Sequence, residues 1–286
     1  MGKTRNMNNR FFINIVLLVV VALFACSNTG KSQNANSDKR MNVEIKTSLG
    51  DIVVSLYNET PKHRDNFLKL VKEGYYDGVL FHRVIKDFMV QTGDGNSKTA
   101  KQDDVLGAGD PGYTIEAEIV YPKFFHKRGA LAAARTGDEV NPEKRSSGSQ
   151  FYIVTGEKYT TAQMASMEKN MVNMKKNSIF TKFVNERRQD IIKMQQQGDT
   201  LGLKELEHEL VALTEAEYAK NPVSLTSEQR QAYTTEGGTP HLDGNYTVFG
   251  EVVKGMDVVD KIQNVKTGRN DRPVEDVRII SMKVLP

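Results

Sequence analysis

The stretch from Phe81 to Asp94 constrains the fold of this chain more than any other. It alternates apolar and polar side chains and ends in a glycine-containing turn, which predicts a half-buried β-strand. One short, stiff piece of backbone then carries a cation, two large apolar groups and an amide, namely Arg83, Phe88, Met89 and Gln91. Such groups suit a site that grips an apolar group together with a carbonyl dipole. The pattern also fits a barrel strand whose arginine simply faces solvent.

The positive charge of the chain is concentrated at its start. The 286 residues carry a formal net charge of +3, and three of the 39 basic residues lie within the first 25 positions, where there is no acidic residue. The rest of the chain therefore holds 36 basic and 36 acidic residues. This balance argues against nucleic acid as the main partner.

The N-terminus has the pattern of a bacterial export signal. The basic start leads into an apolar run, 11–25, which is short for a bilayer span of about 17–25 residues but suits a secretory signal. The segment Leu23–Cys26 resembles a lipobox, and Cys26 is the only cysteine. We therefore expect residues 1–25 to be a lipoprotein signal peptide, Cys26 to be lipidated and 26–40 to be a flexible tether. An uncleaved anchor helix with an incidental cysteine is the alternative.

Most of the remaining chain is predicted to form short strands. Alternation on both sides of Ser48–Asp51 predicts a β-hairpin, and Thr60-Pro61 followed by an apolar stripe predicts a helix that ends at Gly74. Further strands are expected at 114–119, 129–135, 150–154, 246–250 and 277–284, with a second helix at 256–262. Many short strands with two helices predict a mainly β fold, a closed antiparallel barrel that exposes no sheet edge.

A helical segment, 158–239, interrupts this β pattern. Thr160 with Gln163 matches the capping box, and Gly198 separates two amphipathic stretches. Thr226 with Gln229 matches a second capping box, which predicts a short third helix. The first stretch carries methionines at helical spacing, Met164, Met167, Met171 and Met174. The second carries leucines, Leu203, Leu206, Leu210 and Leu213. We expect an inserted α-helical hairpin. Either the methionines pack against the leucines, or their flexible thioethers leave an adaptable surface for unfolded clients.

No metal or covalent chemistry is indicated. The glycines of 107–112 match a dinucleotide-binding pattern on paper, but they follow no apolar strand and precede no helix. The five histidines are scattered, without cysteine or glutamate at ligand spacing. The sequence therefore predicts no cofactor and no metal.

Four motifs in order resemble those of the cyclophilin-type peptidyl-prolyl isomerases. They are Phe81–Ile85 with Phe88, Met89 and Gln91, then 129–134, then 148–153, and finally 242–244 with 248–250. The resemblance covers about 41–157 and 240–286, and 158–239 lies outside it. It implies a closed eight-stranded antiparallel barrel, capped by two helices, with a binding groove on its outer surface.

The resemblance also implies roles for individual residues. Arg83 would be the catalytic guanidinium, and Gln91 with Gln150 would hold Arg83 and the substrate backbone. The other substrate-binding positions would be Phe88, Met89, Ala134, Arg135, Tyr152, His241, Leu242 and Tyr246. Among these, Ala134 and the Arg135 backbone would pair with the substrate chain. Tyr152, His241 and Tyr246 stand where phenylalanine, tryptophan and histidine are usual in eukaryotic members.

By resemblance, the chain isomerises X-Pro bonds in exported proteins and assists their folding without a cofactor. Its partners would be proline-containing segments of unfolded or folding proteins, together with a membrane bound through Cys26. We expect a lipid-anchored location in the bacterial envelope, on the periplasmic face of the outer membrane. The alternative is a non-catalytic module that binds proline-containing segments as a chaperone. A purely structural envelope lipoprotein would explain the tether but not the groove residues.

Overall fold

The computed structural model describes residues 39–286. The predicted signal peptide, the lipidation site at Cys26 and nearly all of the tether lie outside the described residues. Residues Arg40–Pro286 form one compact unit. None of the helices in the described part of the chain combines the length and the apolar character needed to cross a bilayer.

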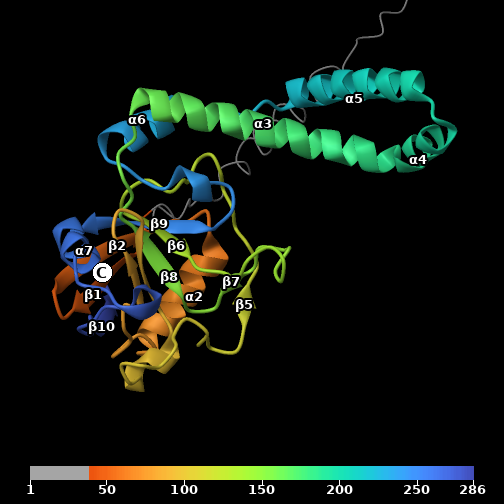
Figure 1. Ribbon diagram of the computed structural model, residues 1–286. Coiled ribbons are helices and arrows are strands. Elements are labelled where there is room, and N and C mark those ends of the chain that lie inside the picture. The colour runs from red at the N-terminus through yellow and green to blue at the C-terminus, as the bar shows by residue number, and fades with distance from the viewer. Residues whose placement is uncertain (1–38) are drawn as a thin grey trace, which may run out of the picture. The chain divides into compact units, whose positions relative to one another are not determined.

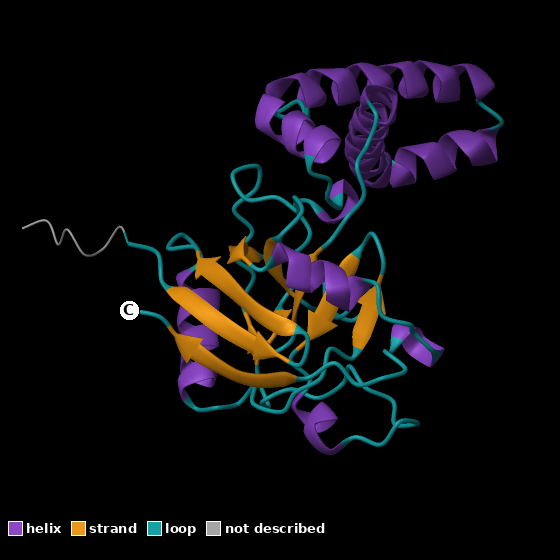
Figure 2. Ribbon diagram, turned by 90° about the vertical axis from the view of Figure 1, so that its left-hand side faces the viewer, coloured by secondary structure: helices purple, strands orange, loops and turns teal. Residues whose placement is uncertain are grey.

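An eight-stranded antiparallel sheet forms the body of this unit (Figures 1 and 2). Its strands lie in the order β10-β1-β2-β9-β6-β8-β4-β3. Their bounds are β1 Asn42–Thr47, β2 Gly50–Leu56, β3 Arg83–Ile85, β4 Met89–Thr92, β6 Ala130–Ala133, β8 Phe151–Val154, β9 Val248–Lys254 and β10 Ile279–Val284. A separate two-stranded sheet pairs β5, Thr114–Ile115, with β7, Ser146–Ser147.

The prediction of a closed barrel is wrong, because the sheet is an open half-barrel with β3 and β10 at its edges. The contacts across this seam fall on the residues that precede β3. The Phe81 N–H donates to the Val277 carbonyl at 2.9 Å, and the Ile279 N–H donates to the Val79 carbonyl at 2.8 Å. One isolated bridge joins Leu80 to Arg278. These bonds bring the two edges together without extending the strand ladder from β10 to β3.

The stretch 81–94 is a hairpin and not the single strand that its alternation predicts. β3 and β4 are antiparallel, and Asp87 in the turn between them has a φ of 57°, in the left-handed region. Two short strands joined in this way keep the same apolar alternation as one long strand, so the pattern could not reveal the turn. As a consequence, Arg83 and Gln91 are cross-strand partners.

Six α-helices lie within residues 39–286, which exceeds the predicted two caps, two helices of the hairpin and short third helix by one. The helices α2, Pro61–Lys72, and α7, Met256–Gln263, pack on the sheet. The others form what we call the helical arm, α3 Thr161–Glu186, α4 Arg188–Gln197, α5 Thr200–Lys220 and α6 Ser227–Thr235 (Figure 1). The first predicted helix of the arm is interrupted at Arg187, which separates α4 from α3. The expected break at Gly198 and both predicted capping boxes are confirmed.

The methionines of α3 lie in two different environments. Met164 is buried, and Met167 and Met171 pack with it in a cluster that contains Phe125, Leu225, Ala232 and Tyr233. Met174, at the far end of the stripe, is 73% exposed. The first part of the stripe therefore joins the arm to the sheet through α6 and the residues before β6.

The two ends of the arm meet where the chain leaves β8 and returns toward β9. The Gly238 N–H donates to the Glu157 carbonyl at 3.0 Å, and the Arg128 N–H donates to the Gly237 carbonyl at 2.9 Å. A side chain at Gly156 would collide with the backbone of Gly238. The two backbones can approach so closely because both residues are glycines.

Candidate active site

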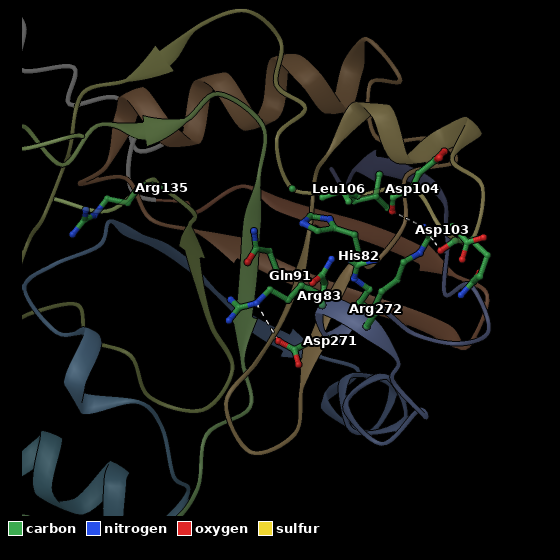
Figure 3. Close-up of a pocket in the computed structure, with 14 residues that line it drawn as sticks. His82, Arg83, Gln91, Asp103, Asp104, Leu106, Arg135, Asp271 and Arg272 are labelled. Carbon is green, nitrogen blue, oxygen red and sulfur yellow. Dashed lines mark hydrogen bonds and ion pairs between the residues drawn. The ribbon is translucent and has the colours of Figure 1, made fainter. Parts of the chain in front are cut away.

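Arg83 lies on β3, and its side chain is 41% exposed. Figure 3 shows it beside Asp271. Its Nε is 3.6 Å from Oδ2 of Asp271. Asp271 belongs to a single 3₁₀ turn, Arg269–Asp271, and has a φ of 58°. A carboxylate carried by a tight turn therefore restrains the guanidinium at its Nε. Sequence reasoning missed Asp271.

A cavity of about 100 Å³ lies beside Arg83. Nine of the eleven predicted site residues line it: Arg83, Phe88, Met89, Gln91, Ala134, Arg135, Tyr152, Leu242 and Tyr246. Met89 and Tyr152, from neighbouring strands β4 and β8, are buried, whereas Phe88, Leu242 and Tyr246 are partly buried. The site therefore joins a small hollow, walled in part by aromatic and aliphatic side chains, to the half-exposed side chain of Arg83.

The two glutamines bind each other. Gln91 Nε2 donates to Gln150 Oε1 at 3.1 Å, and Gln150 Nε2 donates to the carbonyls of Gly107 and Gly109, both at 2.9 Å. Gln150 is buried and lies outside the cavity itself. The structure thus ties Gln91 to the loop at 107–109 through Gln150, while the ion pair of Arg83 is with Asp271. The predicted hold of Gln91 and Gln150 on Arg83 and the substrate backbone stays a prediction.

The backbone of Ala134 already takes part in the fold. Its N–H donates to the Gln150 carbonyl at 3.0 Å, and its carbonyl accepts from the Ser147 N–H at 2.8 Å. The expected pairing of Ala134 with a substrate chain is therefore limited to the second lone pair of its carbonyl. Its small side chain instead forms part of the cavity wall, next to Arg135.

The side chain of Arg135 is held over Tyr246. Its Nε donates to the Asn245 carbonyl at 2.9 Å, and its guanidinium carbon is 4.5 Å from the centroid of the Tyr246 ring. This is the geometry of a cation–π contact, which fixes the aromatic wall of the cavity. His241 is exposed and does not line the cavity, but it stacks on Phe88 with ring centroids 5.4 Å apart. His241 therefore extends the rim of the site.

A larger hollow, of about 730 Å³, shares Arg83, Gln91 and Arg135 with the small cavity (Figure 3). His82, the residue before Arg83, lines it and is only 4% exposed. Burial lowers the pKa of His82 to about 4, although the Asp94 carboxylate opposes this shift. The imidazole next to Arg83 is therefore neutral at pH 7.

Sequence reasoning also missed a polar chain beneath the cavity. The Tyr152 hydroxyl is 3.0 Å from Nε2 of His126, and Nδ1 of His126 is 3.0 Å from Oδ1 of Asp243. His126 is buried, and it lies before β6, far from Tyr152 in sequence. The available signal was Tyr152 itself, since a tyrosine in an apolar pocket needs a partner for its hydroxyl.

The chain matches the family model of the cyclophilin type peptidyl-prolyl cis-trans isomerases over residues 42–165 and 157–284. These matches span most of the sequence, so the protein belongs to this family and is an isomerase of peptide bonds that precede proline. The resemblance inferred from the four motifs is confirmed at the level of the family.

Several bacterial proteins are similar to this chain. One of Staphylococcus haemolyticus, provisionally named a peptidyl-prolyl cis-trans isomerase, is 30% identical over 249 residues, covering 86% of this chain and 92% of that protein. One of Streptococcus pyogenes serotype M6, provisionally named a bifunctional phosphatase/peptidyl-prolyl cis-trans isomerase, is 33% identical over 249 residues. The alignment covers 85% of this chain but only 38% of the streptococcal protein.

A solved structure shares the fold. The crystal structure of a cyclophilin type peptidyl-prolyl cis-trans isomerase of Cryptosporidium parvum superposes with a TM-score of 0.51 and 20% sequence identity. The match covers 86% of this chain and 98% of that protein. It supports a cyclophilin-like arrangement of the antiparallel sheet.

Proposed function

We propose that the proline ring of the substrate enters the cavity beside Arg83 and that this guanidinium catalyses the rotation. The observation that carries this proposal is the position of the half-exposed Arg83 side chain at a small cavity that has Phe88, Met89, Tyr152 and Leu242 among its walls. These aromatic and aliphatic walls would anchor the ring on one side of the peptide bond while the other side turns.

The physical chemistry of the peptide bond explains why an arginine suffices. Resonance opposes rotation with a barrier of roughly 18–20 kcal/mol, and uncatalysed prolyl isomerisation takes tens to hundreds of seconds. Twisting the bond returns the lone pair to the proline nitrogen, which can then accept a hydrogen bond. A donor aimed at this nitrogen therefore stabilises the transition state and not the planar amide. Arginine suits this role because its planar guanidinium presents a rigid fork of charged donors.

A protease-coupled assay on a proline-containing tetrapeptide tests this assignment. Arg83→Ala is expected to lower kcat/KM by roughly 10²–10³-fold, the usual effect of removing one preorganised donor. Arg83→Lys is expected to fail as well, because an ammonium group does not reproduce the planar fork. Arg188→Ala, which removes an exposed arginine of α4, is the control and should leave kcat/KM unchanged. A folded Arg83→Ala protein as active as the wild type would refute the assignment.

We further propose that the chain is an envelope lipoprotein whose clients are exported proteins. The support is in the sequence, where a basic start, an apolar run and a lipobox-like segment end at Cys26. In this organisation residues 1–25 are removed, 26–40 tether the enzyme, and 158–239 are inserted between the two parts of the cyclophilin-like body, 41–157 and 240–286. The predicted location is the outer membrane, facing the periplasm. Metabolic labelling with a palmitate analogue should be lost in Cys26→Ser, and persistent labelling would exclude lipidation at this residue.

A second function, the holding of unfolded clients, is favoured by the surface of the arm. Met174 and Leu201 are 73% and 74% exposed, and Val211 and Leu213 are about half exposed. Apolar side chains of this kind, methionine above all, adapt to varied partners. If the arm holds clients, Arg83→Ala should still suppress the aggregation of an unfolded protein as the wild type does. Loss of suppression in step with loss of isomerase activity would exclude a separate holding function.

A further inference from the structure

Asp243 lies at the junction of the sheet body and the helical arm, with its side chain only 3% exposed. Its Oδ1 accepts from the His126 backbone N–H at 2.8 Å and lies 3.0 Å from His126 Nδ1. Its Oδ2 accepts from the Tyr233 hydroxyl at 2.6 Å and from Gln229 Nε2 at 3.4 Å. Tyr233 and Gln229 belong to α6 and are completely buried. One carboxylate therefore binds the arm on one side and His126 on the other.

The chemistry of these groups gives the chain of hydrogen bonds a direction. A carboxylate only accepts, so the imidazole proton of His126 lies on Nδ1 and is donated to Asp243. With one proton on the ring, the other ring nitrogen is an acceptor, and the Tyr152 hydroxyl at 3.0 Å is its donor. Burial raises the pKa of Tyr152, which keeps its hydroxyl protonated and able to donate.

The last member of this chain forms part of the cavity proposed for the proline ring. The Tyr246 ring packs edge-on against both His126 and Tyr152, with centroid separations of 6.2 and 6.0 Å. Displacement of His126 would therefore move two aromatic walls of the cavity. It would also leave a buried hydroxyl without a partner, which is costly in an apolar environment.

We infer that His126 and Asp243 are positioning residues for the proline cavity, and that α6 of the arm holds them in place through the Tyr233 hydroxyl. The inference rests on the proposed use of this cavity and assigns the base of the arm to the catalytic machinery. Tyr233 lies outside the cavity, so its influence passes through Asp243, His126 and Tyr152.

The test is the removal of one hydroxyl at the far end of the chain. Tyr233→Phe keeps the buried ring but deletes its bond to Asp243, and we expect KM for a proline-containing tetrapeptide to rise about three- to tenfold with kcat little changed. The matched control is Tyr159→Phe. The Tyr159 ring packs edge-on against Tyr233, in the same cluster, but it is not part of the hydrogen-bonded chain. Removing the Tyr159 hydroxyl should leave KM unchanged.

A double-mutant cycle distinguishes positioning from a general loss of packing. In a Tyr152→Phe background the hydroxyl that the chain holds is absent, so Tyr233→Phe should no longer raise KM. An equal rise in KM in both backgrounds would overturn the inference, because the arm would then act by another route. Should Tyr233→Phe fail to fold, Tyr152→Phe alone tests the chain from its other end, and an unchanged KM there would overturn it.

The outcomes also separate this inference from the proposed function. If Arg83→Ala abolishes activity but Tyr233→Phe matches the wild type in KM, the assignment of Arg83 stands and the positioning chain is refuted. If Arg83→Ala remains fully active, the proposed site itself is wrong, whatever Tyr233→Phe does.

Discussion

Replacing His82 by glutamine should remove part of the acid sensitivity of this protein. The His82 imidazole is 4% exposed, and its burial lowers its pKa from 6.5 to about 4, against the opposing effect of the buried Asp94 carboxylate. In the unfolded chain the imidazole titrates near its ordinary value of about 6.5. Between these two pH values the unfolded state binds more protons than the folded state, so the free energy of unfolding falls as the pH falls.

The size of the effect follows from the difference between the two pKa values. A shift from 6.5 to about 4 corresponds to about 3 kcal/mol of stability, present in full above pH 6.5 and lost by pH 4. About 2.5 kcal/mol of it should already be lost at pH 4.5. Such a loss is a large fraction of the stability of an ordinary domain, about 5–15 kcal/mol.

Urea unfolding at several pH values between 7 and 4.5 measures this contribution. The stability of His82→Gln should decline less steeply than that of the wild type, by about 2.5 kcal/mol over the range. Burial also lowers the pKa of His63, but this group and the carboxylates titrate in both proteins and cancel in the comparison. His208→Gln, at an exposed position of α5, is the control. Parallel stability curves for the wild type and His82→Gln would refute the reasoning.

Three further predictions concern the site and the arm. Gly238→Ala should lower the free energy of unfolding, measured in urea, by about 2–4 kcal/mol. The φ of Gly238 is 156°, and a methyl group there would collide with the His126 carbonyl and the Tyr233 ring. An unchanged free energy of unfolding would contradict this prediction. Asp271→Asn should change kcat/KM by no more than about fivefold, because half-exposed ion pairs contribute roughly 0.2–1 kcal/mol. A hundredfold loss of kcat/KM would mean that the ion pair is essential for orienting Arg83. Replacing 177–214 by a short Gly/Ser turn should spare the tetrapeptide activity, because the base of the arm is retained, whereas a fall comparable to that of Arg83→Ala would show that the outer arm supports the site.

Local sequence signals predicted the parts of the fold that depend on neighbouring residues. Both capping boxes of the arm begin helices where expected, because the bonds that define them span only three residues. The hairpin of β1 and β2 and the inward face of α7, with Val258, Val259 and Ile262 buried, follow from the same short-range periodicity. Nine of the site residues predicted from the motifs line one cavity.

Features that depend on distant contacts could not be predicted. The partner of Arg83 is Asp271, on a turn near the other end of the chain, and no local pattern connects them. Whether the sheet closes depends on the backbone hydrogen bonds between residues 78–81 and residues 277–279. Hydrophobic periodicity carries no information about such long-range pairing. His126 lies 26 residues before Tyr152, and no local pattern in the sequence connects the two side chains.

The close approach of the Gly156 and Gly238 backbones has a consequence for chain entropy. Because the backbone hydrogen bonds of the body already hold the two ends of the arm together, the polypeptide between them behaves as a loop whose closure is fixed by the body. The entropic cost of such a loop grows only with the logarithm of its length, so that doubling it costs about 0.6 kcal/mol. The outer part of the arm can therefore be lengthened, shortened or exchanged for another domain at little cost to the sheet, provided that the two glycines and the turns beside them are kept.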